Sequence, residues 1–259
     1  MPKRLFKQVV YVASFAAVVI GIVSVILYFV LKQPPSCFDK KLNQGETEVD
    51  CGGPCVSCDL RHLKPLQVSG VTLFDSGQGA VSTLVEVRNL NPNYGADHFS
   101  YTIDFYDKFS KKIFSYDGES FVYPGRIKKL VDTGIAIGLQ DIGRAELTID
   151  TSSLSWRPVI EFIPAKTDIR ELDIGIDSAT QNVVISGLAI NNNAYAVPEI
   201  NVVAIIYNKR DVPINIAKTL LKDFPPFHER SFQISIPVVD VSNFNRESTD
   251  IFLEASPQQ

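Results

Sequence analysis

The feature that most constrains this chain is an uninterrupted apolar run near its N-terminus, Val9 to Leu31, which contains no charged residue. A helix rises about 1.5 Å per residue, so a run of this length spans about 34 Å and can cross a hydrocarbon core of roughly 30 Å. A buried core helix seldom runs so long without a polar residue. We therefore expect a transmembrane helix that contacts the lipid bilayer.

A cleavable signal peptide is the main alternative to a membrane anchor. Its apolar region is usually only about 7–15 residues long, and residues 32–36 offer no small-residue cleavage site. Positive charge precedes the run at Lys3, Arg4 and Lys7, whereas only Lys32 closely follows it, which favours a cytoplasmic N-terminus. We expect an uncleaved signal anchor in the cell membrane, with everything after it outside the cytoplasm.

The remainder of the chain is acidic. The first 32 residues hold four of the 25 basic residues and no acidic residue, so the rest carries a net charge of about −8. This excess excludes a chain-wide basic surface for nucleic acid. It also predicts an ectodomain that does not bind anionic lipid.

All four cysteines lie in one short window, as Cys37, Cys51, Cys55 and Cys58. Outside the cytoplasm two disulfides are the default, although the sequence does not choose among the three pairings. A zinc site with four cysteine ligands is an alternative, but such sites usually have two close pairs and Cys37 has no close partner. The last two cysteines also match the C-x-x-C redox pattern, without the strand and helix that accompany it in redox proteins.

The loop between the cysteines is rich in oxygen ligands, and a Ca²⁺ site is the one cofactor that the sequence suggests. The loop does not follow the EF-hand spacing, so a solvated acidic turn is the other interpretation. The candidate ligands are Asp39, Asn43, Glu46 and Asp50.

This window resembles a known cysteine module of exported bacterial proteins, with the pattern C-x-D-x3-N-x2-E-T-x-V-D-C-G-G-x-C-x2-C. Every position that the pattern specifies is present between Cys37 and Cys58. The module often accompanies adhesion-type or β-sandwich domains. The resemblance implies an exported bacterial protein with a small disulfide knot, and it names no ligand.

Beyond residue 65 apolar residues alternate with polar ones, as in half-buried strands. Glycine-, proline- and asparagine-rich turns separate these runs, and no amphipathic helix longer than two turns interrupts them. Short strands at this spacing predict antiparallel β-sandwiches. The clearest runs are 81–87, 99–105, 172–176, 200–206 and 232–236.

The β-region also contains an internal repeat, which predicts a duplicated domain. Its landmarks recur in the same order at an offset of 99 to 102 residues. The matched segments are 87–89 with 189–191, 103–107 with 204–208, 123–125 with 224–226, and 135–137 with 234–236.

The first copy resembles two families of small β-sandwich domains. Ile103 to Asp107 and the later Tyr123-Pro124-Gly125 are similar to the FxLYD-type domain, and Val85 to Pro92 is similar to the V-x-V-x-N-x-N-P segment of late-embryogenesis-abundant type-2 domains. Both families imply an Ig-like antiparallel sandwich in an exported or membrane-proximal module, without known catalytic residues. The second copy departs from both patterns at Ala204, Asn208 and Pro226.

No catalytic motif is present in the sequence. The three histidines, His62, His98 and His228, have neither metal-ligand spacing nor the order of a catalytic triad. We expect no catalytic residues, no enzyme activity and no small-molecule substrate. The single tryptophan, Trp156, is expected to pack between the domains, and an exposed tryptophan beside Arg157 as a contact site is the alternative. Val203, Ile205 and Tyr207 break the polar alternation of their strand, which fits either burial between two sheets or a partner interface.

The sequence thus predicts an all-β ectodomain of two tandem Ig-like antiparallel β-sandwiches behind one transmembrane helix and a disulfide-rich linker. Its expected function is a non-catalytic surface, scaffold or adhesion module with a protein partner. A metal-stabilised envelope sensor or assembly subunit is the alternative, and a thiol redox protein is a further one. The expected segments are 1–8 (cytoplasmic tail), 9–31 (signal anchor), 32–65 (linker), 66–165 (first sandwich) and 166–259 (second sandwich).

Overall fold

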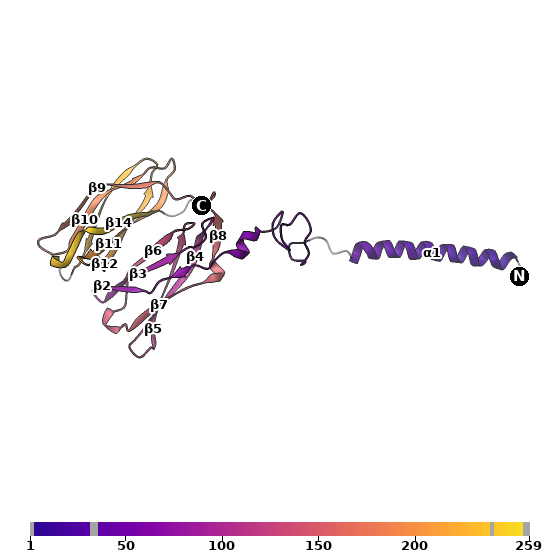
Figure 1. Ribbon diagram of the computed structural model, residues 1–259, viewed down its shortest axis with the longest axis horizontal. Coiled ribbons are helices and arrows are strands. Elements are labelled where there is room, and N and C mark those ends of the chain that lie inside the picture. Colours follow the sequence, from indigo (N-terminus) through magenta and orange to yellow (C-terminus); the bar gives the residue numbers. More distant parts are fainter. Residues whose placement is uncertain (1–2, 32–35, 239–240, 256–259) are drawn as a thin grey trace. The chain divides into compact units, whose positions relative to one another are not determined.

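The computed structural model describes residues 3–31, 36–238 and 241–255 (Figure 1). Three parts of the predicted segments lie outside the described residues: residues 1–2 of the tail, Lys32 behind the apolar run, and residues 256–259 of the second sandwich. The chain forms two compact units, Met1–Leu63 and Lys64–Gln259.

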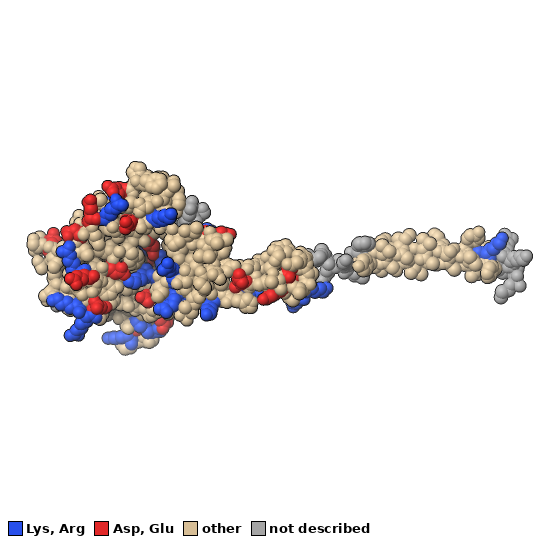
Figure 2. Space-filling view, turned by 45° about the horizontal axis from the view of Figure 1, so that its top comes forward, with Lys and Arg blue, Asp and Glu red and all other residues tan. Residues whose placement is uncertain are grey.

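The first unit begins with helix α1, Lys3–Leu31, which contains the whole predicted apolar run. Its stretch Phe6–Tyr28 is long and apolar enough to cross a membrane, and none of it is buried within the protein. From Val9 onward this stretch contains no charged residue, and Figure 2 shows basic side chains only near the N-terminal end of the helix. The helix starts six residues before the predicted span, because Lys3 to Gln8 are residues that readily continue helical hydrogen bonding.

The rest of the first unit is a compact loop held by two disulfides. Its regular structure is the short 3₁₀ helix η1, Cys58–His62, and an isolated antiparallel bridge between Glu48 and Cys51. The loop needs glycine at its turn: Gly53 has φ +56°, and a Cβ there would lie 2.5 Å from the carbonyl oxygen of Gly45. Disulfides in this region confirm the prediction from the clustered cysteines.

The second unit is built from antiparallel strands, as predicted, with three 3₁₀ turns: η2 (Leu139–Asp141), η3 (Thr151–Ser153) and η4 (Val241–Asn243). The strands are β1 (Gln67–Val68), β2 (Thr72–Gly77), β3 (Ala80–Arg88), β4 (Tyr94–Tyr106), β5 (Lys112–Val122), β6 (Ile127–Ile135), β7 (Arg144–Ile149), β8 (Ser155–Pro158), β9 (Thr167–Ile176), β10 (Val183–Asn191), β11 (Val197–Asn208), β12 (Pro213–Phe224), β13 (Glu229–Ile236) and β14 (Phe244–Ala255).

These strands form two sandwiches with matching topology. In the first, β3 pairs with β1, β2 and β6, while β4 pairs with β5, β7 and β8. In the second, β10 pairs with β9 and β13, while β11 pairs with β12 and β14. β1 and β2 together take the place of β9, and β7 and β8 together take the place of β14. With that difference, the order of pairing along the chain is the same in both halves. The ladders set Ile135 opposite Val81 and Ile236 opposite Val183, so the position equivalent to Ile135 is Ile236 and not the predicted Ile234.

Each sandwich has its own apolar core. The inward residues of β4 alternate as predicted, with Phe99, Ile103 and Phe105 inaccessible to solvent. Trp156 packs against this same first core, so the expectation that it packs between the domains is wrong. In β9 only Ile174 is buried, because β9 is an edge strand with a register shift opposite Ser186 and Leu188.

A pair of buried asparagines closes the same end of each sandwich. In the second sandwich the Asn191 carbonyl accepts from the backbone and side-chain N–H groups of Asn193, and its amide donates to three backbone carbonyls. Asn193 in turn bonds both the N–H and the carbonyl of Lys166, where the chain enters the sandwich. In the first sandwich Asn89, Asn91 and Lys64 repeat this pattern.

The two sandwiches share a third apolar cluster, and strand β11 explains it. Val202, Ala204 and Ile206 face the second core, whereas Val203 and Ile205 point the other way and pack with Phe74 and Val131 of the first sandwich. The broken alternation in β11 therefore reflects burial against the neighbouring sandwich. β11 is buried on both faces.

The sheets that meet at this contact are not equivalent ones. The first sandwich uses the outer face of its β3 sheet, including the ladder pair Leu84–Val131, and the second uses its β11 sheet, including Val203–Phe252. The matching pairs on the two remaining outer faces are Ser186–Gln233 and Thr102–Thr148. These are polar, and none of the four side chains is buried. Consistent with polar outer faces, Figure 2 shows acidic and basic side chains interspersed on the second unit.

Candidate functional site

The cysteine module pairs Cys37 with Cys55 and Cys51 with Cys58. The two cysteines of the C-x-x-C motif thus belong to different disulfides. A redox dithiol of the C-x-x-C type forms a disulfide within its own motif, and this arrangement does not.

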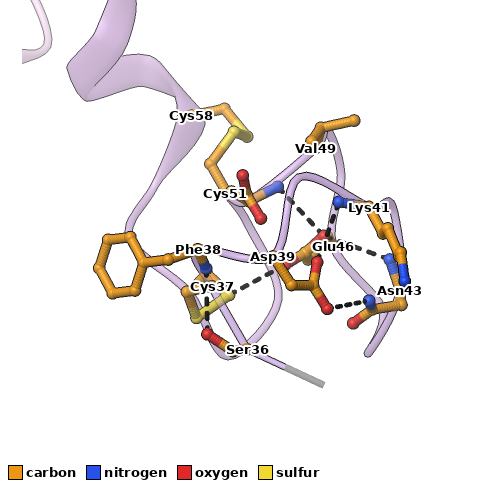
Figure 3. The surroundings of a disulfide bond; sticks show 12 residues. Ser36, Cys37, Phe38, Asp39, Lys41, Asn43, Glu46, Val49, Cys51 and Cys58 are labelled. Carbon is orange, nitrogen blue, oxygen red and sulfur yellow. Dashed lines mark hydrogen bonds between the residues drawn. A yellow bond between two sulfur atoms is a disulfide. The ribbon is translucent and has the colours of Figure 1, made fainter. Parts of the chain in front are cut away.

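The predicted calcium ligands mostly bond to their own loop (Figure 3). The Asp39 carboxylate accepts from the side-chain amide of Asn43 at 2.8 Å and from the N–H of Lys41 at 2.9 Å. The hydrogen bond from Asn43 is the main cause that lowers the pKa of Asp39. The Asp50 carboxylate accepts from the N–H of Lys40 at 2.9 and 3.1 Å.

Glu46 lies at the centre of this loop and is 9% exposed. One carboxylate oxygen accepts from the N–H groups of Asn43 and Asp50 at 3.2 and 3.1 Å, and the other lies 3.2 Å from the sulfur of Cys55. The structure therefore brings the Glu46 side chain to the backbone of Asn43 and Asp50. The carboxylates of Asp39, Glu46 and Asp50 all accept hydrogen bonds from within the loop and so hold it closed around its disulfides.

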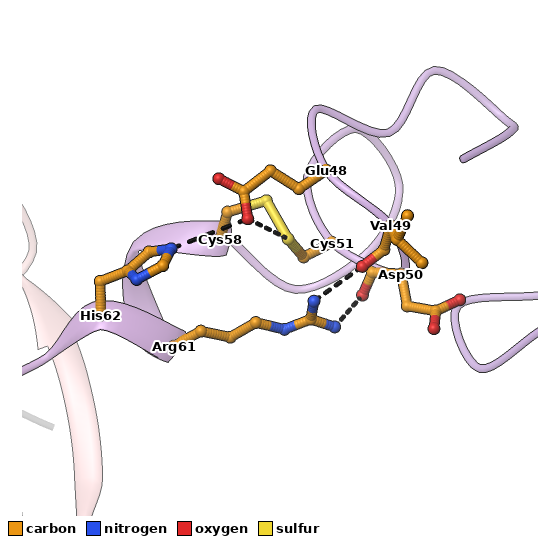
Figure 4. A network of polar contacts seen from close by, with 7 residues as sticks. All are labelled: Glu48, Val49, Asp50, Cys51, Cys58, Arg61 and His62. Carbon is orange, nitrogen blue, oxygen red and sulfur yellow. Dashed lines mark hydrogen bonds and ion pairs between the residues drawn. A yellow bond between two sulfur atoms is a disulfide. The ribbon is translucent and has the colours of Figure 1, made fainter. Parts of the chain in front are cut away.

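A second polar network surrounds the Cys51–Cys58 disulfide (Figure 4). The Arg61 guanidinium donates to the carbonyls of Val49 and Asp50 at 2.7 and 2.6 Å. The Glu48 carboxylate lies 3.7 Å from the His62 ring nitrogen. Arg61 and His62 both come from η1, so these contacts hold that helix against the loop.

Two groups of three possible ligand atoms lie within 4.8 Å of one another in the part of the chain that the structure describes. One consists of Cys37, Glu46 and Cys55, and the other of Glu48, Cys51 and Cys58. Both sulfurs of each group are disulfide-bonded here. A metal binds the thiolate form of cysteine, so neither group is a metal site in this oxidation state.

The other two histidines lie apart from the module, on the second unit. His98 is in β4, where the neighbouring Asp97 carboxylate pairs with the Arg157 guanidinium at 2.7 Å. His228 bonds the carbonyl of Pro226 in the turn before β13. Both contacts, the Asp97–Arg157 ion pair beside His98 and the bond of His228 to a backbone carbonyl, are of the kind that structural residues make.

A cavity of about 580 Å³, which no pattern in the sequence indicated, lies between the two sandwiches. Its walls are β6, the end of β14 and the 164–167 connection, with aromatic side chains from Phe121, Tyr123 and Phe252. Lys128 lies in its wall, 8% exposed, paired with Glu254 and 3.8 Å from the ring centroid of Phe121. Burial lowers the pKa of Lys128, and the Glu254 carboxylate opposes that shift.

A buried acid lies on the same face of β6. Asp132, 4% exposed, accepts from the hydroxyls of Tyr101 at 2.8 Å and Tyr116 at 3.3 Å, and lies 3.7 Å from the amine of Lys218 on the second sandwich. Burial, together with the charge of Asp132, raises the pKa of Tyr101. The same two causes raise the pKa of Tyr116 to about 12. The signal was present in the sequence: Lys128 and Asp132 share the inward parity of Leu130.

No family model matches this chain. No curated protein matches it either. Solved structures resemble it only weakly. Red sea bream transglutaminase matches at 11% identity and a TM-score of 0.26 over 68% of this chain, which spans only 27% of that enzyme. A protein of Parabacteroides distasonis matches at 11% identity and a TM-score of 0.22, over 77% of this chain and 87% of the other.

A tandem CBM22 domain from Paenibacillus barcinonensis Xyn10C matches at 10% identity and a TM-score of 0.13, over 74% of this chain and 93% of the other. Likeness at these levels assigns neither a family nor a function. The apolar helix and the disulfides together indicate a membrane-anchored or secreted extracytoplasmic protein.

Proposed function

We propose that this protein is a single-pass, membrane-anchored interaction module whose head binds a protein partner outside the cytoplasm, without catalysis. In this proposal α1 is an uncleaved signal anchor with its N-terminus in the cytoplasm, and the cysteine module stiffens the exit from the membrane. The head consists of two Ig-like sandwiches that arose by duplication. The matching topology and the repeated asparagine pairs support the duplication.

The observation that carries the partner-binding proposal is the connection between β8 and β9. Within five residues it exposes three aliphatic side chains, Val159 at 44%, Ile160 at 77% and Ile163 at 65%. Between them, Phe162 is 2% exposed and packs 4.6 Å from the ring centroid of Tyr123. The buried ring anchors the segment while its neighbours remain in water, and clustered exposed apolar side chains are typical of contact sites.

Site-specific photo-cross-linking in intact cells tests this proposal. The full chain carries a photoreactive residue at Ile160 in one sample and at Gln233, on the exposed polar face of β13, in a matched control. We expect one discrete cross-linked species from position 160 and none from position 233. Equal cross-linking from both positions, or none from position 160, would contradict a partner at this segment.

The orientation needs its own test, because partner binding does not depend on which end is cytoplasmic. A cytoplasm-only reporter fused before Lys3 is expected to be active, and the same reporter fused after residue 255 is expected to be inactive. Exchanging Lys3, Arg4 and Lys7 for glutamine removes the positive charge before the span and is expected to lower this asymmetry. A reporter active only at the C-terminal end would contradict the proposed topology.

A further inference from the structure

We propose that Cys51, Cys58, His62 and Glu48 form a zinc site when a thiol reductant opens the Cys51–Cys58 disulfide. The proposal goes beyond partner binding by the head, because metal uptake by the module is measured independently of any partner. It assigns a metal site to residues that differ from the oxygen ligands expected from the sequence. Figure 4 shows the four side chains together.

The distances from the Glu48 carboxylate to the other groups approach those of a tetrahedral site, whereas His62 lies outside the three ligand atoms that are all within 4.8 Å of one another and must turn toward the sulfurs when the disulfide opens. Metal bonds of about 2.0–2.3 Å place neighbouring ligand atoms about 3.3–3.8 Å apart. The Glu48 carboxylate oxygen lies 4.0 Å from the sulfur of Cys51 and 3.7 Å from the His62 ring nitrogen. It also lies within 4.8 Å of the sulfur of Cys58. Two thiolates, one imidazole and one carboxylate are ligand types that zinc accepts.

The scaffold that places these ligands does not depend on the Cys51–Cys58 bond alone. Backbone hydrogen bonds join Glu48 and Cys51 in both directions, at 3.1 and 3.3 Å. Arg61 holds η1, which carries Cys58 and His62, against the carbonyls of Val49 and Asp50. Opening the disulfide therefore leaves contacts that keep all four ligands near one another.

The other sulfur pair is a poorer candidate for zinc. Cys37 and Cys55 have only Glu46 as a third group, with no histidine in that cluster. One oxygen of Glu46 already accepts two backbone N–H groups, so metal binding would compete with closure of the loop. In contrast, His62 and Glu48 are exposed, at 69% and 54%, and a metal ion reaches them from solvent.

The chemistry balances with a thiol as the named reductant. Two thiols transfer two electrons and two protons to the Cys51–Cys58 disulfide, which yields two cysteine thiols and one new disulfide between the reductant molecules. Zn²⁺ then displaces the two thiol protons and takes a lone pair from neutral His62 and from the Glu48 carboxylate. Oxidation reverses the sequence and releases the metal.

Cobalt titration of the full chain in detergent micelles tests this site. Dithiothreitol reduces the protein and is removed by gel filtration without oxygen, and Co²⁺ is then added as the probe. We expect one Co²⁺ per chain with the visible absorption of a tetrahedral thiolate site, its displacement by Zn²⁺, and no such spectrum from the oxidised chain. Equal binding by the oxidised chain would overturn the proposal.

Variants decide which residues bind the metal. His62→Ala is expected to weaken cobalt binding at least tenfold, while the matched control His228→Ala leaves it unchanged. Cys37→Ser/Cys55→Ser is expected to keep the site, and its loss in that variant would indicate four thiolate ligands. His62→Ala retains all four cysteines, so it decides the question even if the double variant does not fold. Equal affinities of the two histidine variants would exclude His62.

Discussion

At the scale of single residues, the buried asparagines determine how each sandwich is closed. Asn191 is inaccessible to solvent, and its amide donates to the carbonyls of Tyr195, Phe224 and Pro225. An asparagine meets this demand because its side chain carries two N–H donors and one carbonyl acceptor. One side chain therefore joins the turn that follows β10 to the backbone of Phe224 and Pro225, which is more than 30 residues away in sequence.

Asn191→Ala is expected to lower the free energy of unfolding by about 2–4 kcal/mol, because it leaves buried carbonyl groups without a donor. The matched control is Asn192→Ala, whose side chain is exposed and whose backbone bond to Lys166 survives the change. Chemical denaturation followed by circular dichroism measures the difference. Similar losses in both variants would contradict this role.

Two half-buried tyrosines, Tyr116 against the first core and Tyr123 in the wall of the cavity, predict a loss of stability at alkaline pH. Burial raises the pKa of Tyr123 to about 12 and that of Tyr116 also to about 12, from an ordinary value of 10.0. The unfolded chain therefore releases these protons first, and the free energy of unfolding falls as the pH rises above about 10. Below that pH the stabilisation is complete. The low pKa of Lys128 acts in the opposite direction.

Thermal unfolding between pH 8 and pH 11.5, with tyrosinate absorbance recorded in parallel, measures this dependence. Tyr123→Phe removes one titrating group, so we expect a shallower decline above pH 10 in that variant. An equally steep decline in wild type and variant would show that Tyr123 does not contribute.

At the scale of elements, β11 differs from its counterpart β4 in what covers its outer face. Val203 and Ile205 are buried against the first sandwich, whereas the equivalent Thr102 and Asp104 make cross-strand contacts with Asp117 and Ser115. The two strands have the same pattern of core-facing residues. They differ on the outer face, which the neighbouring sandwich covers only in β11.

Ile205→Ala is expected to lower the stability of the head by about 3 kcal/mol, since it removes a fully buried side chain and leaves a cavity. Thr102→Ala, at the β4 position equivalent to Val203 on the same outer face, serves as the control and is expected to cost much less. Calorimetry reports both values and also the number of transitions. A single unchanged transition in Ile205→Ala would mean that this contact contributes little.

Much of this architecture could be predicted from residue patterns, and the failures have physical causes. Alternation revealed the strands because it reflects which face is buried, and the clustered cysteines indicated disulfides. Their pairing depends on distances across the loop, which spacing does not contain. The role of Val203 and Ile205 stayed open, because apolar residues on both faces of β11 indicate that both faces are covered. They do not indicate whether a neighbouring sheet or a partner covers them. Lys128 shares the inward parity of Leu130, but its pairing with Glu254 of the second sandwich could not be predicted, because the sequence does not show which residues meet across the contact.

At the scale of the whole molecule, the contact between the sandwiches joins two different faces. Contacts of this heterologous kind can continue without limit when each added unit offers the same two faces. Here the remaining faces carry Thr102–Thr148 and Ser186–Gln233 in place of apolar pairs. We expect these polar residues to oppose the addition of a further sandwich to either face.

Apolar substitutions on both free faces are expected to restore continued stacking. Thr102→Val with Asp104→Ile changes one face, and Ser186→Leu with Gln233→Val changes the other. Light scattering after gel filtration is expected to show larger assemblies only when all four substitutions are combined. Each pair alone is the control, because one apolar face lacks a complementary free face. A monomeric fourfold variant would contradict this explanation.

The Cys37–Cys55 disulfide also determines how a pulling force would pass from helix α1 to the sandwiches. The two cysteines are 18 residues apart in sequence, a length that extends to about 60 Å when pulled straight, yet their Cα atoms are 5.6 Å apart. A pulling force therefore passes through the sulfur bridge and bypasses the loop that contains Asp39, Asn43 and Glu46. While the bridge is intact, that loop adds no contour length, and its hydrogen bonds stay unstrained under load.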